Sequence, residues 1–346
     1  MTDLKSQTLT ELQKEMEQLG EKKFRAKQLY SWMHEKLVDD FDQMTNLPKG
    51  LLTRLKENYT LTRLVPLEVQ VSKQDGTAKF LFQLPDGNVI ESVLMRYHHG
   101  NSVCISSQVG CRMGCRFCAS TLGGLTRGLT PSEMLEQIYQ IQKWSKERVH
   151  NVVVMGTGEP LDNYETLLRF IELLSTEGGL HISQRNITVS TCGIVPKIKE
   201  LAKENLQITL ALSLHAPTQE KRKSLMPIAS RYELSEVIEA CCYYFNKTKR
   251  RITFEYSLVG GINDTREDAK ELIRLLKPLN CHVNLIPVNP IKERDYVESK
   301  HQTVINFKNY LEKSGIHVTI RRELGRDIDG ACGQLRKSYM DREEER

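Results

Sequence analysis

The sequence predicts an α/β fold: a partial (β/α)6 barrel similar to a TIM barrel, with a small helical N-terminal domain and a β extension. Three patterns support this prediction. After about residue 100, six apolar runs of strand length alternate with segments of helical periodicity. The first sixty residues contain three short segments of helical periodicity. Between these parts, three strand-like runs are separated by Asp-Gly pairs, which are typical of hairpins. Repeated βα units favour a parallel sheet with helices outside.

Short amphipathic helices are expected in the N-terminal part of the chain, over residues 8–19, 24–38 and 48–58. Gly20 and Pro48 separate them, because glycine favours a helix end and proline favours a first helical turn. Residues 1–60 are therefore predicted to form a helical accessory domain.

The β extension is predicted over residues 61–97. Its strand-like runs are Leu67–Val71, Ala78–Leu84 and Val89–Met95. Asp75-Gly76 and Asp86-Gly87 lie between these runs and predict two hairpin turns. We expect this part to connect the helical domain with the barrel.

The barrel core is expected over residues 98–335. Its predicted strands are Val103–Ser106, Val152–Met155, Ile187–Ser190, Ile208–Leu214, Ile252–Tyr256 and Val283–Pro287. Its clearest helical segments are 131–147, 164–176, 233–247 and 265–277. Ligands of such barrels bind at the carboxyl ends of the strands, so residues directly after each strand are functional candidates. Residues 336–346 form a charged tail, of which Asp341–Arg346 is expected to be disordered.

The amino-acid composition indicates in which cellular compartment the protein is expected. Of the 346 residues, 39% are hydrophobic and 27% are charged, as is ordinary for soluble globular proteins. The chain has neither an apolar run of about eighteen residues nor a signal-peptide pattern at its start, so we expect a cytoplasmic protein without membrane spans. Its nine cysteines should then stay reduced.

The net charge of +5 permits a nucleic-acid partner without requiring one. Residues 1–60 carry as many acidic as basic side chains, so they form no basic arm. Local basic clusters occur at Lys22, Lys23, Arg25 and Lys27, at Lys221, Arg222 and Lys223, at Lys249, Arg250 and Arg251, and at Arg321 and Arg322. Taken singly, each cluster is most simply interpreted as a solvated surface.

The strongest chemical signal is a C-x3-C-x2-C loop directly after the first predicted barrel strand, formed by Cys111, Cys115 and Cys118. Dense thiolates favour iron–sulfur clusters or zinc. A structural zinc site needs four protein ligands, and no fourth cysteine or histidine lies at a compact spacing. Three thiolates on a four-iron cluster leave one iron open for a ligand. The spacing therefore favours a catalytic [4Fe-4S] cluster.

This loop resembles the hallmark of the radical S-adenosylmethionine (SAM) superfamily, in which the open iron binds SAM and electron transfer generates a 5′-deoxyadenosyl radical. A second motif agrees: Met155-Gly156-Thr157-Gly158-Glu159-Pro160 ends the second predicted strand. Glycines allow close approach of backbone to a ligand. The Glu159 carboxylate is suited to accept a hydrogen bond from the ammonium group of SAM.

The chain also resembles, almost from end to end, the dual-specificity RNA methyltransferases, which methylate C2 of an adenine in 23S rRNA and some tRNAs. The resemblance is carried by FRAKQLYSWMHEK, CISSQVGCRMGCRFCAS, MGTGEPLDN, SLHAP, LIPVNP and DIDGACGQL. It implies that the three loop cysteines hold the cluster. The SAM contacts that it implies are Gly158, Glu159, Ser190, Ser213, Leu214, His215 and Asn289.

The same resemblance implies three catalytic side chains. Cys332 would first accept a methyl group from one SAM, and the radical from a second SAM would activate that methyl for addition to the adenine. Cys104 would release the crosslinked product and end in a transient disulfide with Cys332. Glu91 matches the proton-handling carboxylate. A radical donor is chemically sensible because C2 of adenine is electron-poor.

Further implications concern partners: 23S rRNA and tRNA as substrates, an electron donor such as flavodoxin or ferredoxin, an N-terminal domain that binds RNA, and a monomeric enzyme. The sequence departs from the family at two small positions, with Cys192 where serine is more common and Gly330 where alanine is more common. Both changes affect local thiol chemistry at most.

Three alternatives stay open. A sister branch of the family methylates C8 of the same rRNA adenine and shares the cysteines, although MGTGEP and STLGGLTR are more like the C2 branch. A radical SAM enzyme acting on a small molecule would not need Cys332 or the N-terminal domain. A non-enzymatic RNA-binding protein with a structural metal would contain zinc and no labile sulfide.

Overall fold

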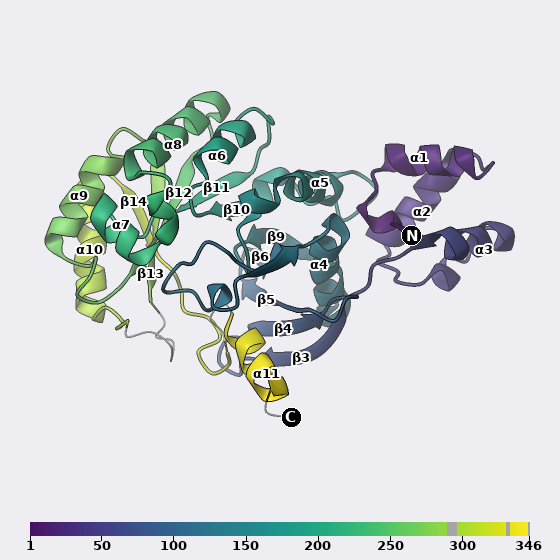
Figure 1. Cartoon of the computed structure of the whole chain (residues 1–346), viewed down its shortest axis with the longest axis horizontal. Helices are drawn as coiled ribbons and strands as arrows, with labels where there is room; N and C mark the ends of the chain where they lie inside the picture. Colours follow the sequence, from purple (N-terminus) through teal and green to yellow (C-terminus); the bar gives the residue numbers. More distant parts are fainter. Residues whose placement is uncertain (289–295, 330–332, 345–346) are drawn as a thin grey trace.

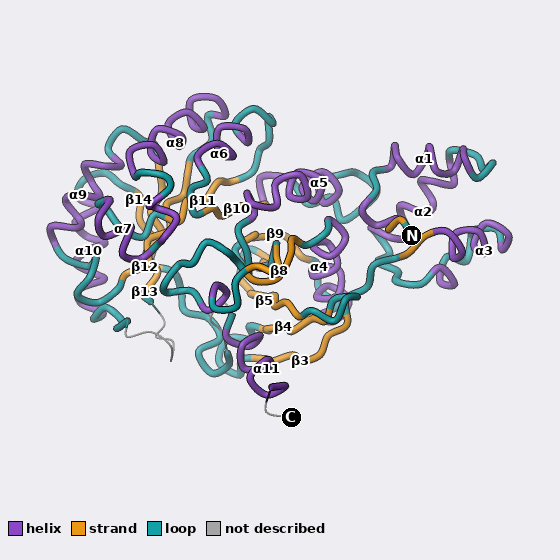
Figure 2. The backbone as a smooth tube through the Cα atoms, viewed as in Figure 1, coloured by secondary structure: helices purple, strands orange, loops and turns teal. Residues whose placement is uncertain are grey.

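The computed structural model of the chain describes residues 1–288, 296–329 and 333–344. Its main feature is a curved sheet of ten strands in the order β14-β13-β12-β11-β10-β9-β6-β5-β4-β3 (Figures 1 and 2). The parallel part consists of β6 (Gly100–Cys104), β9 (Val149–Val154), β10 (Ile187–Thr191), β11 (Thr209–Ser213), β12 (Ile252–Leu258), β13 (Cys281–Pro287) and β14 (His317–Ile320). The antiparallel part consists of β3 (Val65–Val71), β4 (Ala78–Gln83) and β5 (Val89–Tyr97).

Helices follow the parallel strands, as the alternating pattern predicted. They are α4 (Pro131–Ser145), α5 (Tyr164–Ser175), α6 (Val195–Leu201), α7 (Gln219–Leu225), α8 (Leu234–Thr248), α9 (Arg266–Leu276) and α10 (His301–Lys313). Helices α6, α8, α9 and α10 lie along the outer side of strands β10 to β14 (Figure 1). Local sequence fixes where α4 begins, because Thr130 and Glu133 form a capping box around Pro131.

The sheet has one parallel strand more than the six that the sequence predicted. The seventh, β14, has four residues in which buried and more exposed side chains alternate, so it offers no continuous apolar run. Within the described residues, no pairing joins β14 to β3. The sheet is therefore open, and the prediction of a partial barrel is confirmed.

The β extension belongs to the same sheet as the barrel. β5 pairs antiparallel with β6, the first parallel strand, and β4 and β3 follow outward. Both predicted hairpin turns are present, and Gly76 and Gly87 have positive φ angles of 72° and 85°. Strands β3 to β5 thus continue the core sheet.

The N-terminal helical domain lies beside the barrel (Figure 1). Its elements are β1 (Thr2–Asp3), α1 (Leu9–Gln18), α2 (Phe24–His34), α3 (Lys49–Asn58) and β2 (Tyr59–Thr60). Helix α2 is shorter than the predicted 24–38, because Leu37 has a left-handed backbone with φ of 59°. None of the described helices is long and apolar enough to cross a membrane.

Two buried polar contacts join this domain to helix α4. Lys5 is fully buried, and its Nζ lies 2.6 Å from the Glu136 carboxylate. Nδ1 of His34 lies 2.7 Å from the Tyr139 hydroxyl. Because buried polar groups need partners, these contacts restrict how the domain can pack against the barrel.

The chain also forms shorter elements: the hairpin strands β7 (Gln108–Gly110) and β8 (Leu125–Gly128), and the 3-10 turns η1 (Leu4–Ser6), η2 (Phe41–Gln43), η3 (Ala119–Thr121), η4 (Pro160–Asn163), η5 (Gln184–Asn186) and η6 (Pro227–Ser230).

The prediction of a disordered tail over Asp341–Arg346 is wrong for residues 341–344. They belong to helix α11 (Gln334–Glu344), which contacts β5 and η3. An ion pair of 2.6 Å between Arg342 and Glu68 of β3 attaches the helix to the sheet. The charges that suggested disorder are thus partly used in packing; residues 345 and 346 lie outside the described part.

Candidate active site

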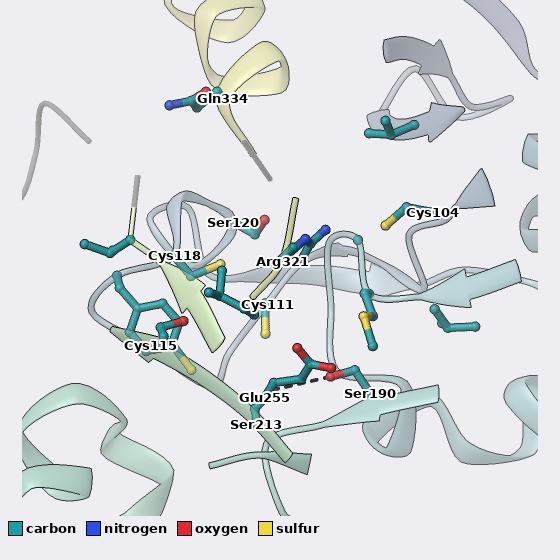
Figure 3. A pocket seen from close by; sticks show the side chains of 18 of the residues that line it. Cys104, Cys111, Cys115, Cys118, Ser120, Ser190, Ser213, Glu255, Arg321 and Gln334 are labelled. Carbon is teal, nitrogen blue, oxygen red and sulfur yellow. Dashed lines mark hydrogen bonds between the residues drawn. The ribbon is translucent and has the colours of Figure 1, made fainter. Parts of the chain in front are cut away.

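A cavity of about 700 Å³ lies at the carboxyl ends of the parallel strands. Nine of the predicted site residues line it: Cys104, Cys111, Cys115, Cys118, Gly158, Glu159, Ser190, Ser213 and His215. Figure 3 shows the three loop thiols on one side, Cys104 on the other side, and Gln334 of α11 above. The structure therefore brings together residues that are more than a hundred positions apart in the sequence.

The cysteine loop is held by backbone contacts at both ends. The Cys111 N–H donates to the Gly124 carbonyl at 2.8 Å, beside the β7–β8 hairpin. At the other end, the Arg116 N–H donates to the Leu225 carbonyl of α7 at 2.9 Å. Gly110 is required here, because a Cβ would lie only 2.0 Å from the Gly124 oxygen. The loop thus starts on the sheet and ends against α7.

The thiols of this loop need a positive centre to ionise. Burial raises the pKa of Cys111 to about 12 and also raises the pKa of Cys115, and neighbouring thiols add to both effects. Thiolates are the metal-binding form, so binding of a cationic centre must offset this burial.

The donor set fits a cluster better than a single ion. Among the described residues, no three His, Cys, Asp or Glu side chains are placed to share one metal ion. The three thiols instead line one common cavity, and soft thiolates spread over a wider space suit a multi-iron cluster. Cys111, Cys115 and Cys118 are therefore suited to hold a [4Fe-4S] cluster.

The glycine-rich turn after β9 packs closely against the strand end of β6. A Cβ on Gly156 would lie 2.7 Å from the Ile105 carbonyl oxygen, and one on Gly158 would lie 2.7 Å from the Ser107 hydroxyl. Gly158 also has φ of 115°, which side chains rarely adopt. These glycines therefore allow the turn to reach the cavity wall.

Glu159 is buried and joins the ends of two strands. One carboxylate oxygen accepts the Cys192 N–H at 2.7 Å and the other accepts the Leu161 N–H at 3.0 Å. Burial raises the pKa of this carboxyl group. The side chains of Thr191 and Cys192 also hydrogen-bond to this carboxylate, which therefore braces the strand ends at the cavity wall.

Polar groups at the ends of β10 and β11 face the cavity. The Ser190 and Ser213 hydroxyls lie 3.4 Å apart (Figure 3). His215 accepts the Ser257 N–H at Nδ1 over 3.0 Å, which leaves the proton on Nε2 of the neutral ring. Burial and the Arg222 charge lower the His215 pKa to about 3, so the ring stays neutral.

Leu214 is placed differently from its neighbours. Its side chain is fully buried in the core and does not line the cavity. Its N–H donates to the Glu255 carbonyl at 3.0 Å, and its carbonyl accepts the Ala216 N–H at 2.8 Å. Leu214 thus fixes the turn that presents Ser213 and His215.

Glu91 lies outside the cavity lining but holds the C-terminal segment. Its carboxylate accepts the N–H of Gly333 and, at 3.1 Å, the N–H of Arg336. The fully buried Lys79 lies 3.2 Å away and donates to the Asp329 carbonyl at 2.6 Å. Two further predicted residues, Cys332 and Asn289, lie outside the described residues.

Sequence reasoning missed Glu255 of β12, which lines the cavity (Figure 3). Its carboxylate accepts a hydrogen bond of 2.9 Å from the Asn284 amide, and burial raises its pKa. An acidic residue inside the apolar strand run Ile252–Tyr256 was the available signal. Three arginines after β14, Arg321, Arg322 and Arg326, also line the cavity; the first two formed one of the basic clusters.

Two family models match the chain. Residues 105–276 match the radical SAM superfamily, and residues 2–61 match the ribosomal RNA large subunit methyltransferase N-terminal domain. The radical SAM superfamily uses a [4Fe-4S] cluster and SAM, in agreement with the thiol-lined cavity.

Curated relatives are similar over nearly the whole chain. A probable dual-specificity RNA methyltransferase RlmN of Lachnospira eligens is 67% identical and covers 99% of this chain and 97% of its own. One of Lachnoclostridium phytofermentans is 64% identical, with coverages of 98% and 96%. The crystal structure of a radical SAM methyltransferase from Sphaerobacter thermophilus is 43% identical, with a TM-score of 0.91 over 96% of this chain and 99% of that chain. The chain is therefore an enzyme that belongs to the dual-specificity RNA methyltransferase family of the radical SAM superfamily.

Proposed function

We propose that the protein methylates C2 of an adenine in 23S rRNA and in some tRNAs, with a [4Fe-4S] cluster and two SAM molecules per turnover. One observation carries this proposal: a single cavity gathers the loop thiols, Cys104 and the strand ends beside an attached C-terminal segment. The full-length similarity to relatives named as dual-specificity RNA methyltransferases supports the substrate class.

The strand ends would hold SAM next to the cluster on Cys111, Cys115 and Cys118. When bound, cluster and SAM supply the carbon radical of the reaction. Beside Gly158, the Glu159 carboxylate would accept a hydrogen bond from the ammonium group of SAM, because a carboxylate in this buried site forms a strong charge-assisted hydrogen bond. Ser190, Ser213 and Asn289 would provide polar contacts.

The neutral His215 ring carries a proton on Nε2 and faces the ring of Phe117, with centroids 4.7 Å apart. It can donate one hydrogen bond to a ligand in the cavity without adding charge. Leu214 would contribute through the backbone turn it fixes.

Cys332 would accept the first methyl group, with its thiolate as the nucleophile and S-adenosylhomocysteine as the leaving group. The next residue supports this role, since a Cβ on Gly333 would lie 2.8 Å from the N atom of Ser120, two residues after Cys118. After the methylene has joined the adenine and the adduct has lost one electron and its C2 proton, Cys104 would attack the Cys332 sulfur. The bond between this sulfur and the methylene carbon would break, the carbon would take a proton to become the methyl group, and the two cysteines would end as a disulfide. Cys104 is buried in the opposite wall of the cavity, which suits this later step.

Glu91 would remove the proton from C2 of the adduct. Its contacts with Gly333 and Arg336 support the role, because they place the carboxylate at the segment that carries Cys332. The same carboxylate therefore serves both to anchor this segment and to handle the proton.

The enzyme would work with RNA substrates and an electron donor. The N-terminal domain, residues 1–60, would bind RNA, as its match to the ribosomal RNA methyltransferase domain supports. The core would span 98–335, after the 61–97 extension. Arg321, Arg322 and Arg326 at the cavity suit contacts with RNA phosphates beside a flipped-out adenine. We propose a monomer that works in the cytoplasm and takes electrons from a flavodoxin or ferredoxin.

Comparison of nucleosides from cells with and without the protein tests this function. Digests of 23S rRNA and tRNA should contain 2-methyladenosine only when the wild-type protein is present. Complementation with Cys332→Ala should not restore it. Cys242→Ala serves as the matched control, because Cys242 lies on α8 and does not line the cavity. Loss of 8-methyladenosine instead would support the C8 alternative, and no change in either nucleoside would refute the proposal.

A further inference from the structure

Arg222 of helix α7 is a buried cation that has no carboxylate partner among the described residues. The sequence placed it in a basic cluster interpreted as a solvated surface, but its side chain is fully buried. Its Nη2 donates to the Cys192 carbonyl at 2.6 Å. Its Nε and Nη1 atoms are buried and have no hydrogen-bond partner among the described residues.

Its neighbours in helix α7 differ from it. Lys221 pairs with Asp268 at 2.7 Å, and Lys223 is exposed to solvent. Among the described residues, no salt bridge involves Arg222. A guanidinium remains protonated in proteins, so this position holds a positive charge away from water. Such a charge is unfavourable unless an anion compensates it.

Thiols are the groups near Arg222 that can carry a negative charge, and the neutral His215 ring is a further neighbour. Burial lowers the Arg222 pKa, whereas negative charge on Cys192, Cys115 and Cys241 would raise it. Cys115 is one of the proposed cluster ligands. Cys111, Cys192 and Leu225 also pack in one buried cluster with Cys115 against it, so the compensating anion is expected on the side of the cysteine loop.

Helix α7 and the following turn η6 pack against that loop. The Leu225 carbonyl accepts the Arg116 N–H, and a Cβ on Gly114 would contact Pro227 at 3.4 Å. Gly193 leaves room for the guanidinium, because a Cβ there would lie 3.3 Å from Nη2. The surrounding backbone is therefore shaped around both the loop and the Arg222 head group.

We propose that Arg222 is a positioning residue that provides the buried counter-charge of the iron–sulfur cluster. This inference rests on the proposed ligands Cys111, Cys115 and Cys118. A four-iron cluster with three thiolates is anionic and gains one more negative charge on reduction. The guanidinium therefore stabilises the reduced form more than the oxidised form, and it raises the reduction potential that the electron donor must reach.

Redox titration of the anaerobically reconstituted full-length protein tests the inference. Arg222→Met removes the charge at similar length, Arg222→Lys keeps a charge, and Lys223→Met removes an exposed charge from the next residue. Reduced cluster is measured by electron paramagnetic resonance, and bound iron and sulfide are measured for each protein. SAM is left out, so its carboxylate cannot be the compensating anion.

At the wild-type midpoint, the ratio of reduced to oxidised cluster should fall at least tenfold in Arg222→Met. This corresponds to a shift of about 59 mV to more negative potential for a one-electron couple. Arg222→Lys should retain most of the wild-type potential, and Lys223→Met should match the wild type. Arg222→Met with the wild-type potential at full cluster content would overturn the inference.

A structural role alone has a different signature. If Arg222 only holds the Cys192 carbonyl, Arg222→Met should bind less cluster, but the cluster it binds should have the wild-type potential. Should Arg222→Met prove too unstable to load, Arg222→Gln keeps an N–H donor without the charge, and the same shift is expected. Failure of the wild type itself to bind iron and sulfide would refute the proposed cluster ligands rather than the role of Arg222.

Discussion

Replacing Lys79 by Met should weaken the attachment of the C-terminal segment to the sheet. Lys79 and Glu91 form a buried ion pair, with side chains 0% and 4% exposed and charged atoms 3.2 Å apart. Loss of the ammonium leaves the Glu91 carboxylate buried, and its hydrogen-bond donors among the described residues are then the N–H groups of Gly333 and Arg336. It also removes the hydrogen bond to the Asp329 carbonyl.

The expected loss of stability follows from this geometry. Breaking a buried pair costs about 3–5 kcal/mol. Because two backbone N–H groups still bind the carboxylate, we expect a loss at the lower end of this range, about 3 kcal/mol. At roughly 2 °C for each kcal/mol in a chain of this size, the melting temperature should fall by about 6 °C.

A double-mutant cycle with Glu91→Gln isolates the pair. If the ion pair is responsible, Lys79→Met should lower the free energy of unfolding by less in the Glu91→Gln background than in the wild type. The difference between the two losses, which is the coupling energy, should be about 1–3 kcal/mol. Thermal unfolding measures both backgrounds, and hydrogen exchange should show faster exchange at the Gly333 and Arg336 amides in Lys79→Met. Equal losses of stability in both backgrounds, with unchanged hydrogen exchange at these amides, would show that the Lys79–Glu91 ion pair does not hold the C-terminal segment.

Three further predictions concern the thiols, the SAM site and pH. Cys104→Ala should accumulate a covalent protein–RNA adduct, visible as a slow band on a denaturing gel, whereas Cys332→Ala should form none; normal turnover by Cys104→Ala would contradict the assigned order. Glu159→Ala should lower SAM affinity about ten- to a hundredfold in anaerobic titrations, since a hydrogen bond to a charged group contributes about 1.5–3 kcal/mol; unchanged affinity would remove Glu159 from the site. Burial and the Lys5 charge lower the His34 pKa to about 3, so the unfolded chain binds an extra proton between about pH 6.5 and 3. The free energy of unfolding of the wild type should therefore decrease as pH falls through this window, and His34 should contribute up to about 1.4 kcal/mol per pH unit to this decrease. In thermal unfolding, His34→Gln should show a smaller change of stability with pH. Equal changes in both proteins would show that His34 does not titrate this way.

Local patterns in the sequence predicted most of the barrel. Apolar runs of strand length marked the parallel strands β6, β9, β10, β11, β12 and β13, because a strand covered on both faces needs apolar side chains throughout. Turn chemistry at Gly76 and Gly87 predicted the hairpins, since only a few residues accept positive φ. The spacing of the three loop cysteines likewise predicted the proposed cluster loop, because metal ligands within one short loop form a local signal.

Failures of the sequence analysis lie where structure depends on distant contacts. The strand β14 has no apolar run of its own and is defined by pairing with β13. Helix α11 carries the charges expected of a disordered tail, yet Arg342 finds Glu68 across the fold. In both cases the partner, rather than the local sequence, supplies the stabilising interaction.

The sequence by itself determined the chemistry of this protein: a thiolate loop after the first strand, a glycine-rich turn after the second, and the motifs of its family. Only the tertiary structure decided which charges are buried and which groups meet. Glu91 contacts Gly333 although 242 positions separate them. Arg222 and Lys223 are adjacent in one basic cluster, but helix α7 buries the first and exposes the second. The physical reason is that burial and pairing depend on packing between elements, whereas motif chemistry depends on residues held close together by the chain itself.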